Sequence, residues 1–247
     1  MRIAVIADIH GNSAALEAVI SDIAEAGVDL TVNLGDCLAG PLDAAGTARR
    51  LMGLGWPTVM GNHDRWMFER APEEMFAWDR CALAQVGRRE LDWLRGFAPV
   101  IETEGLLFCH GTPGSDTENW LDNRDGANMK MAPRAQVEAA ALGVVAEGFL
   151  CGHTHVQRMV RLADGRLVVN PGSVGCPGYA VRGAEPPFAL STGATDARYA
   201  ILERRGGTWR AELRHVPYDA GPMAALARAV GDEDFARVLE GGWAPPL

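Results

Sequence analysis

The sequence predicts an α/β domain built on a parallel sheet, and three observations lead to this expectation. The chain has 247 residues, of which 48% are hydrophobic and 22% are charged, so it can bury a substantial core. Its first forty residues alternate strand, helix and strand, as a β-α-β unit does. Polar residues then follow short apolar runs, where the carboxyl ends of parallel strands place ligand-binding residues.

The N-terminal unit is predicted in three steps. An apolar run at residues 3–7 is the first strand, and a helix is expected to begin at Asn12 or Ser13 and to end at Gly27. A second strand is expected at residues 28–34. The apolar residues of the helix recur with the spacing of a single helix face, at Leu16, Val19, Ile20 and Ile23.

The remaining chain is expected to continue this single domain, residues 1–247, without a linker. Two segments lack a clear period of apolar residues. Residues 110–133 are interpreted as a long functional loop, and residues 176–197 as a loop excursion at the surface. The C-terminal helical segment is expected at 219–240. The other expected elements are a strand at 57–60, helices at 79–96 and 135–142, a strand at 148–151, and hairpins pairing 100–103 with 106–109, 157–162 with 166–169 and 198–203 with 208–216.

Composition excludes several classes of protein. The formal net charge is −9 and Lys130 is the only lysine, so a long nucleic-acid groove is not expected. The five cysteines lie far apart without a C-x-x-C pair, which argues against a disulfide framework and a thiolate zinc cage. No apolar run reaches the length of a membrane span. We therefore expect a cytoplasmic protein without a membrane partner.

Polar clusters at predicted strand ends carry the functional signal. Five of the six histidines lie beside Asp, Asn or Gly in such clusters. Each cluster alone is better explained by a structural role, such as a helix cap. Together they converge on one edge of a sheet, which makes coincidence a poor explanation. The residues concerned are Asp8, His10, Asp36, Asn62, His63, Asp64, His110, His153 and His155.

The donor atoms of these residues indicate a metal site. Carboxylate, amide and imidazole ligands without a thiolate suit divalent transition metals, with manganese as the first expectation and iron, zinc, nickel or cobalt as alternatives. The set is too large for one ion. Shared between two ions with one bridging Asp, it leaves positions open for water and substrate, which is the arrangement for in-line attack on phosphorus.

The ordered motifs resemble those of the calcineurin-like metallophosphoesterases. They are Asp8-x-His10, Gly35-Asp36, Gly61-Asn62-His63-Asp64, His110 and Gly152-His153-Thr154-His155. The resemblance extends from residue 1 to about 175. Three of its segments resemble in particular the small prokaryotic phosphodiesterase branch, namely 8–12, 110–113 and Asn170-Pro171-Gly172-Ser173-Val174-Gly175. It implies a four-layer α/β/β/α sandwich of two mixed β-sheets flanked by helices.

The resemblance also implies a role for each motif residue. One metal would be held by Asp8, His10 and His155. The other would be held by Asn62, His110 and His153, and Asp36 would bridge the two. His63 would act on the scissile phosphate as general acid or transition-state stabiliser, with Asp64 orienting its ring and Asn62 also contacting substrate. The nucleophile would be a metal-bound hydroxide.

Alternatives to phosphodiester hydrolysis stay open at this point. They are a phosphomonoesterase, acting on nucleotides or phosphoproteins at the same site, and a non-catalytic scaffold. The phosphatases of the family carry Gly-Asp-x-x-Asp-Arg-Gly, but Gly40 occupies the arginine position here, and Arg65 is the candidate substitute. Several aromatic residues are candidates for a base-stacking pocket or for the core, with Trp120 the best placed for stacking: Trp66, Phe68, Phe76, Trp78 and Trp120.

Overall fold

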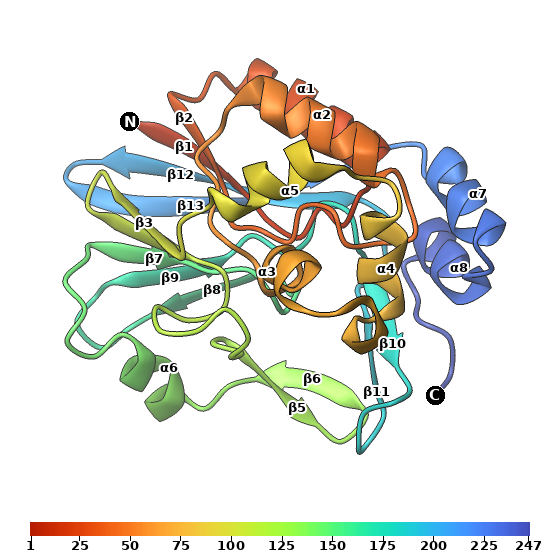
Figure 1. Ribbon diagram of the computed structural model, residues 1–247. Coiled ribbons are helices and arrows are strands. Elements are labelled where there is room, and N and C mark those ends of the chain that lie inside the picture. The colour runs from red at the N-terminus through yellow and green to blue at the C-terminus, as the bar shows by residue number, and fades with distance from the viewer.

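A computed structural model that describes residues 1–247 stacks two β-sheets face to face between layers of helices (Figure 1). One sheet has the strand order β13-β12-β1-β2 and the other has the order β3-β4-β7-β9-β8. Each sheet is mixed: β1 pairs parallel with β2 and antiparallel with β12, and β4, β7 and β9 run parallel between antiparallel neighbours. The predicted four-layer α/β/β/α sandwich is confirmed.

The strands fall into two main sheets and two separate hairpins. The first sheet consists of β1 (Arg2–Ile6), β2 (Leu30–Asn33), β12 (Ala197–Arg205) and β13 (Thr208–Val216). The second sheet consists of β3 (Val100–Thr103), β4 (Leu106–Cys109), β7 (Gly148–Leu150), β8 (Arg158–Arg161) and β9 (Leu167–Asn170). The separate hairpins are formed by β5 (Asp122–Asp125) with β6 (Asn128–Met131), and by β10 (Gly178–Val181) with β11 (Phe188–Ser191).

Helices cover both outer faces and surround the end of the sandwich that carries the polar clusters. In Figure 1, α1 and α2 lie over the first sheet, α6 lies beside the second, and α7 and α8 pack together at one side. None of the helices has the length and apolar character that crossing a membrane requires. The helices are α1 (Ser13–Ala26), α2 (Ala44–Leu54), α3 (Asn62–Glu69), a 3₁₀ turn (Pro72–Glu74), α4 (Ala77–Leu83), α5 (Arg88–Arg95), α6 (Arg134–Ala140), α7 (Gly221–Ala229) and α8 (Glu233–Gly241).

Alternation along the central strand β1 divides the core into layers. Successive side chains of a strand point to opposite faces, so Ala4 and Ile6 pack under α1 and α2, while Ile3 and Val5 pack between the two sheets. A third apolar layer lies between the second sheet and α6 and includes Leu107, Phe149, Val168 and Val137. These layers fix the two sheets against each other, so that the strand ends that carry the polar clusters lie at the same edge of the sandwich.

The predicted N-terminal unit is confirmed. The side chain of Asn12 accepts a hydrogen bond from the backbone N–H of Ala15 at 3.0 Å, which caps α1. Gly27 ends the helix in the left-handed conformation, with φ of 62°. The three predicted hairpins of the main sheets also form.

Three expectations about secondary structure are wrong. Residues 57–60 form no strand, because the chain turns into α3 directly after Met60 and only Thr58 and Val59 make isolated bridges. Helices α2 and α3 are both absent from the predicted elements. For α3 the reason is that it begins within a motif interpreted as part of the site. The unstructured intervals 110–133 and 176–197 each contain a hairpin.

The two unexpected hairpins join each other at the site. Gly126 adopts φ of 61° in the turn between β5 and β6, a conformation that favours glycine, and allows the tight reversal. The N–H of Ala189 in β11 donates to the carbonyl of Ala127 in that turn at 3.0 Å. Segments about sixty residues apart therefore form one wall, and neither is a free excursion.

Candidate dimetal site and substrate pocket

The predicted metal ligands gather in two adjacent groups at the strand ends. Within each group the possible ligand atoms lie within 4.8 Å of one another. The first group consists of Asp8, His10 and His155. The second group consists of Asp36, His110 and His153. One terminal atom of the Asn62 amide lies 3.0 Å from Nε2 of His110 and 2.9 Å from Nδ1 of His153, which adds Asn62 to the second group.

Five of these ligands have a backbone conformation that residues with a Cβ seldom adopt. The chain contains six non-glycine residues with positive φ, and only Glu104 lies outside the site. Left-handed conformations cost such residues about 1–3 kcal/mol each, so they persist where the surrounding structure imposes them, often at functional sites. The five ligands, all in loops after strands β1, β2 and β7, are Asp8, His10, Asp36, His153 and His155.

Hydrogen bonds on the outer side of two rings set their tautomers. Nδ1 of His10 lies 2.6 Å from the carbonyl oxygen of Ala39, and Nδ1 of His110 lies 2.7 Å from that of Leu34. A carbonyl can only accept, so both Nδ1 atoms carry the proton and donate it. In its neutral form each ring then has the lone pair of Nε2 directed into the site, and this is the form that binds a metal.

The possible ligand atoms of the first group face one another. Nε2 of His10 lies 3.1 Å from Nε2 of His155, and Oδ1 of Asp8 is buried without a hydrogen-bond partner. A divalent ion placed among these atoms would satisfy the lone pairs of all three residues. The residues present therefore fit two metal ions.

The electrostatics of the site agree with this interpretation. Burial and the neighbouring His155 lower the pKa of His10 to about 4, and burial and His110 lower the pKa of His153 to about 4. Both rings are thus neutral ligands near neutral pH. Burial also opposes charge on His110, yet Asp36 and Asp8 raise its pKa to about 9, which shows how strongly the carboxylates attract positive charge.

Asp36 lies between the two groups. Its Oδ2 is 3.3 Å from Nε2 of His110 and 3.9 Å from Nε2 of His10, so one carboxylate oxygen is directed at both groups. Asp36 follows β2, the edge strand beside β1, while His10 follows β1 and His110 follows β4 of the other sheet. Stacking of the two sheets is what brings these three residues together.

The structure corrects the role expected for Asp64. Nδ1 of His63 lies 2.6 Å from Oδ1 of Asp79, the third residue of α4, so Asp79 is the carboxylate that contacts this ring. The side chain of Asp64 is fully buried beneath the loops instead. It accepts hydrogen bonds from the backbone N–H groups of Asp36 at 2.8 Å, Cys37 at 2.9 Å and Gly61 at 3.2 Å.

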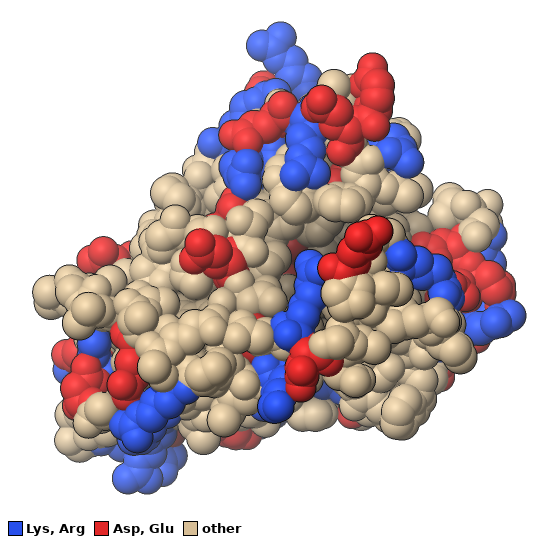
Figure 2. Space-filling model, turned by 90° about the horizontal axis from the view of Figure 1, so that it is seen from below, with Lys and Arg blue, Asp and Glu red and all other residues tan.

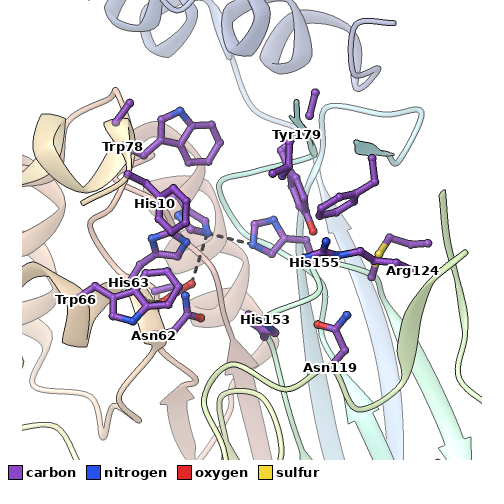
Figure 3. A pocket seen from close by; sticks show the side chains of 17 residues that line it. His10, Asn62, His63, Trp66, Trp78, Asn119, Arg124, His153, His155 and Tyr179 are labelled. Atoms are coloured by element: carbon purple, nitrogen blue, oxygen red, sulfur yellow. Dashed lines mark hydrogen bonds and ion pairs between the residues drawn. The ribbon is translucent and has the colours of Figure 1, made fainter. Parts of the chain in front are cut away.

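A pocket of about 390 Å³ opens beside the two metal groups and includes His63 in its lining. Trp66 and Trp78 lie on the same side as His63, whereas Tyr179 and Arg124 lie opposite, on the two joined hairpins (Figure 3). Other lining residues include Phe76, Asn119 and Phe188. Arg124 is the only lysine or arginine in the lining, and its guanidinium lies 4.2 Å from the ring centroid of Phe188.

Two predicted substrate contacts lie elsewhere. Trp120 is 2% exposed and donates its Nε1–H to the carbonyl of Val137 at 2.9 Å, so it belongs to the core. Arg65 forms ion pairs with Asp116 and Glu69 and does not line the pocket. Of the other aromatic candidates, Trp66, Phe76 and Trp78 line the pocket and Phe68 packs against the core.

Sequence reasoning missed the lining contributed by the hairpins, above all Arg124 and Tyr179. A usable signal exists only for the first of them. The glycine at Gly126, flanked by two four-residue segments, is typical of a two-residue hairpin turn. For Tyr179 no comparable signal stands in the sequence, because its place depends on contacts between β10 and α8.

An α/β/β/α sandwich with two adjoining Asp and His clusters at its strand ends defines a metal-dependent phosphoesterase. The comparison with known sequences agrees. The sequence profile of the calcineurin-like phosphoesterase superfamily domain matches residues 1–193, and the chain belongs to this superfamily. This membership supports phosphoester hydrolysis, and the chain carries two candidate metal-binding clusters.

Solved structures and a curated relative are similar over most of the chain. A metallophosphoesterase from Sphaerobacter thermophilus is 25% identical, with a TM-score of 0.74 over 98% of this chain and 100% of that one. A hypothetical protein from Pyrococcus horikoshii shares the fold, with 18% identity and a TM-score of 0.75 over 99% of each chain. An uncharacterized protein of Methanocaldococcus jannaschii is 25% identical over 241 residues, 88% of each chain.

Proposed function

We propose that this protein is a dimetal phosphodiesterase that hydrolyses small phosphodiesters. Membership of the superfamily supports phosphoester hydrolysis. The preference for diesters rests on one observation: the pocket beside the metal groups has aromatic walls and a single cationic side chain, Arg124.

The chemistry of the two ester classes favours a diester in such a pocket. A monoester carries two negative charges near neutral pH, as phosphorylated side chains do, whereas a diester carries one. Arg65 is already paired with Asp116 and Glu69, so Arg124 is the one arginine offered to the substrate. A diester also has a second organic substituent, and the apolar surfaces of Phe76 and Phe188 can bind it.

Two manganese ions are the cofactors that we propose for the site. Asp8, His10 and His155 would hold one ion, Asn62, His110 and His153 would hold the other, and Asp36 would contact both. The donor set contains only oxygen and nitrogen atoms, which suits manganese, with iron, zinc, nickel and cobalt as alternatives. When bound, the ions supply Lewis-acid activation of water and of the phosphoryl group.

The side chains of the protein supply the remaining chemistry in this proposal. His63 has its Nδ1 directed at Asp79, so its Nε2 is free to donate a proton to the leaving oxygen. The ring of His63 packs edge-on against Trp66, with centroids 4.9 Å apart, which limits its rotation. Asn62, the residue before it, lines the same pocket and anchors the substrate beside the second metal group.

We propose small soluble diesters as substrates, with no long nucleic acid and no membrane as partner. On the face shown in Figure 2, basic side chains stand next to acidic ones and form no continuous basic track. All five cysteines are free thiols, in agreement with the reducing cytoplasm, which is the location we propose.

The test compares kcat/KM for bis(p-nitrophenyl) phosphate and p-nitrophenyl phosphate, using metal-stripped protein reconstituted with manganese. We expect a ratio well above one in protein that holds two metals per chain. A ratio below one would establish a phosphomonoesterase instead. Two bound metals without activity toward either ester would support a scaffold.

Arg124 offers a second test of the same proposal. Arg124→Met should raise KM for the diester about 10- to 150-fold, because a charge-assisted hydrogen bond to substrate is worth about 1.5–3 kcal/mol. Lys130→Met, on the partner strand of the same hairpin, is the matched control and should leave KM unchanged, since Lys130 pairs with Asp125 outside the pocket. Equal KM values for both variants would remove Arg124 from substrate binding.

A further inference from the structure

Asp79 is a buried carboxylate that no motif of the site contains. It is the third residue of α4, its side chain is 0% exposed, and its Oδ1 lies 2.6 Å from Nδ1 of His63. Its other oxygen, Oδ2, accepts the backbone N–H of Phe76 at 3.2 Å. The carboxylate is therefore held from both sides, by the start of α4 and by the imidazole.

The position of Asp79 decides which nitrogen of His63 faces the pocket. A carboxylate accepts the Nδ1 proton, and because Nδ1 is occupied, Nε2 is the ring atom left for a bound substrate. The ring also contacts Trp66 and Phe76 edge-on or tilted, at centroid distances of 4.9 and 6.1 Å. Rotation of the ring by half a turn would break the contact with Asp79 and leave a fully buried carboxylate without its imidazole.

No other carboxylate can perform this task. Both oxygens of Asp64 are taken by backbone N–H groups. Oδ1 of Asp36 accepts the backbone N–H of His63 at 2.9 Å, not a ring nitrogen, and its Oδ2 faces the metal groups. Asp79 comes from an element more than a dozen residues further along the chain, so its contact with His63 is a property of how α3 and α4 pack.

We propose that Asp79 is the positioning residue of the reaction. It holds the His63 ring so that Nε2–H points to the leaving oxygen of the phosphoester. This inference rests on the proposed hydrolytic function, but it does not depend on whether diesters or monoesters are the substrates. It predicts a defect that grows as the leaving group becomes harder to expel, because only a poor leaving group needs the proton from His63.

The experiment measures kcat with methyl p-nitrophenyl phosphate and methyl phenyl phosphate for wild type, Asp79→Asn and Asp79→Ser. Asn keeps the size of the side chain, while Ser keeps an acceptor for α4 but is too short to reach Nδ1. We expect kcat to fall about 10- to 100-fold with the phenyl ester and far less with the p-nitrophenyl ester. KM and the two metals per chain should be unchanged.

Two controls separate positioning from folding. Glu90→Gln alters a carboxylate with the same capping role at the start of α5, where it accepts the N–H of Gly87 at 2.9 Å, and should leave both rates unchanged. In a His63→Ala background, Asp79→Asn should cause no further loss, because the two residues act as one unit. An equal loss with both esters, or additive losses in the double variant, would overturn the proposal.

A spectroscopic measurement tests the contact without turnover. The zinc-loaded wild type should show a slowly exchanging, downfield Nδ1 proton that His63→Ala removes, and Asp79→Ser should remove the same signal. Persistence of that signal at the same position in Asp79→Ser would refute the contact. If the wild type cleaves only monoesters, the kinetic comparison uses aryl phosphate monoesters, so the proposed diester preference can fail while the role of Asp79 stands. If it cleaves neither class, the proton signal alone decides.

Discussion

Replacement of Asp64 by alanine should destabilise the whole domain, because its carboxylate holds the loops that carry the metal ligands. Three buried N–H groups donate to it, those of Asp36, Cys37 and Gly61, at 2.8 to 3.2 Å. A buried donor that loses its acceptor costs about 1–3 kcal/mol, so three donors amount to about 3–9 kcal/mol. A water that enters the vacated space would bring the loss toward the lower end.

The assay is urea unfolding of wild type and Asp64→Ala, both in excess chelator so that metal binding does not contribute. We expect the free energy of unfolding to fall by at least about 3 kcal/mol, a large part of the 5–15 kcal/mol typical of a domain. Asp43→Ala is the matched control. Asp43 caps α2 through one hydrogen bond, to the N–H of Gly46 at 2.8 Å, and its loss should cost about 1 kcal/mol.

The result that would refute this reasoning is a loss no larger than that of Asp43→Ala. Such a result would mean that the three N–H groups find other acceptors and that the Asp64 carboxylate is available to the site. Asp64 would then again be a candidate partner of His63, and Asp79 would no longer be the only carboxylate assigned to that role.

Four further perturbations test other parts of the structure. Asp36→Asn should leave fewer than two metals per chain by elemental analysis, and removal of metal from the wild type by chelator should lower Tm by about 5–10 °C, since ligand at 100 times its Kd stabilises by about 2.7 kcal/mol. Gly175→Ala places a Cβ 1.7 Å from the carbonyl oxygen of Ile9, so urea unfolding should show a loss above about 3 kcal/mol. Trp120→Phe removes the donor to Val137 and should cost about 1–3 kcal/mol while kcat/KM stays unchanged, because Trp120 lies in the core.

Most of the candidate metal ligands could be predicted from sequence because they follow strands closely. Asp8, His10, His110, His153 and His155 are tied to their strands by one to five residues, so strand pairing brings them together. Their strained φ values and the tautomers set by Ala39 and Leu34 were not readable from sequence. These features depend on backbone atoms of other loops.

The residues of the pocket walls could not be predicted from sequence, for a different reason. Arg124 and Tyr179 lie on hairpins whose strands have four residues each and no continuous alternation of apolar and polar side chains. Such short strands form because they pair with each other and pack against β6, β11 and α8, which are contacts between distant segments. The local pattern of apolar and polar residues in these two segments therefore predicted loops.

The sequence by itself determined the superfamily and the set of residues that could hold two metals through its ordered motifs, and the resemblance that these motifs carry implied the four-layer fold. Tertiary structure alone decided which carboxylate contacts His63, which arginine lines the pocket and which tryptophans do so. Asp64 is adjacent to His63 in sequence, yet its side chain turns toward the backbone N–H groups of a buried loop, and Asp79 reaches the ring from another helix. The side chains of residues adjacent in sequence can point in different directions, and packing decides where each of them points.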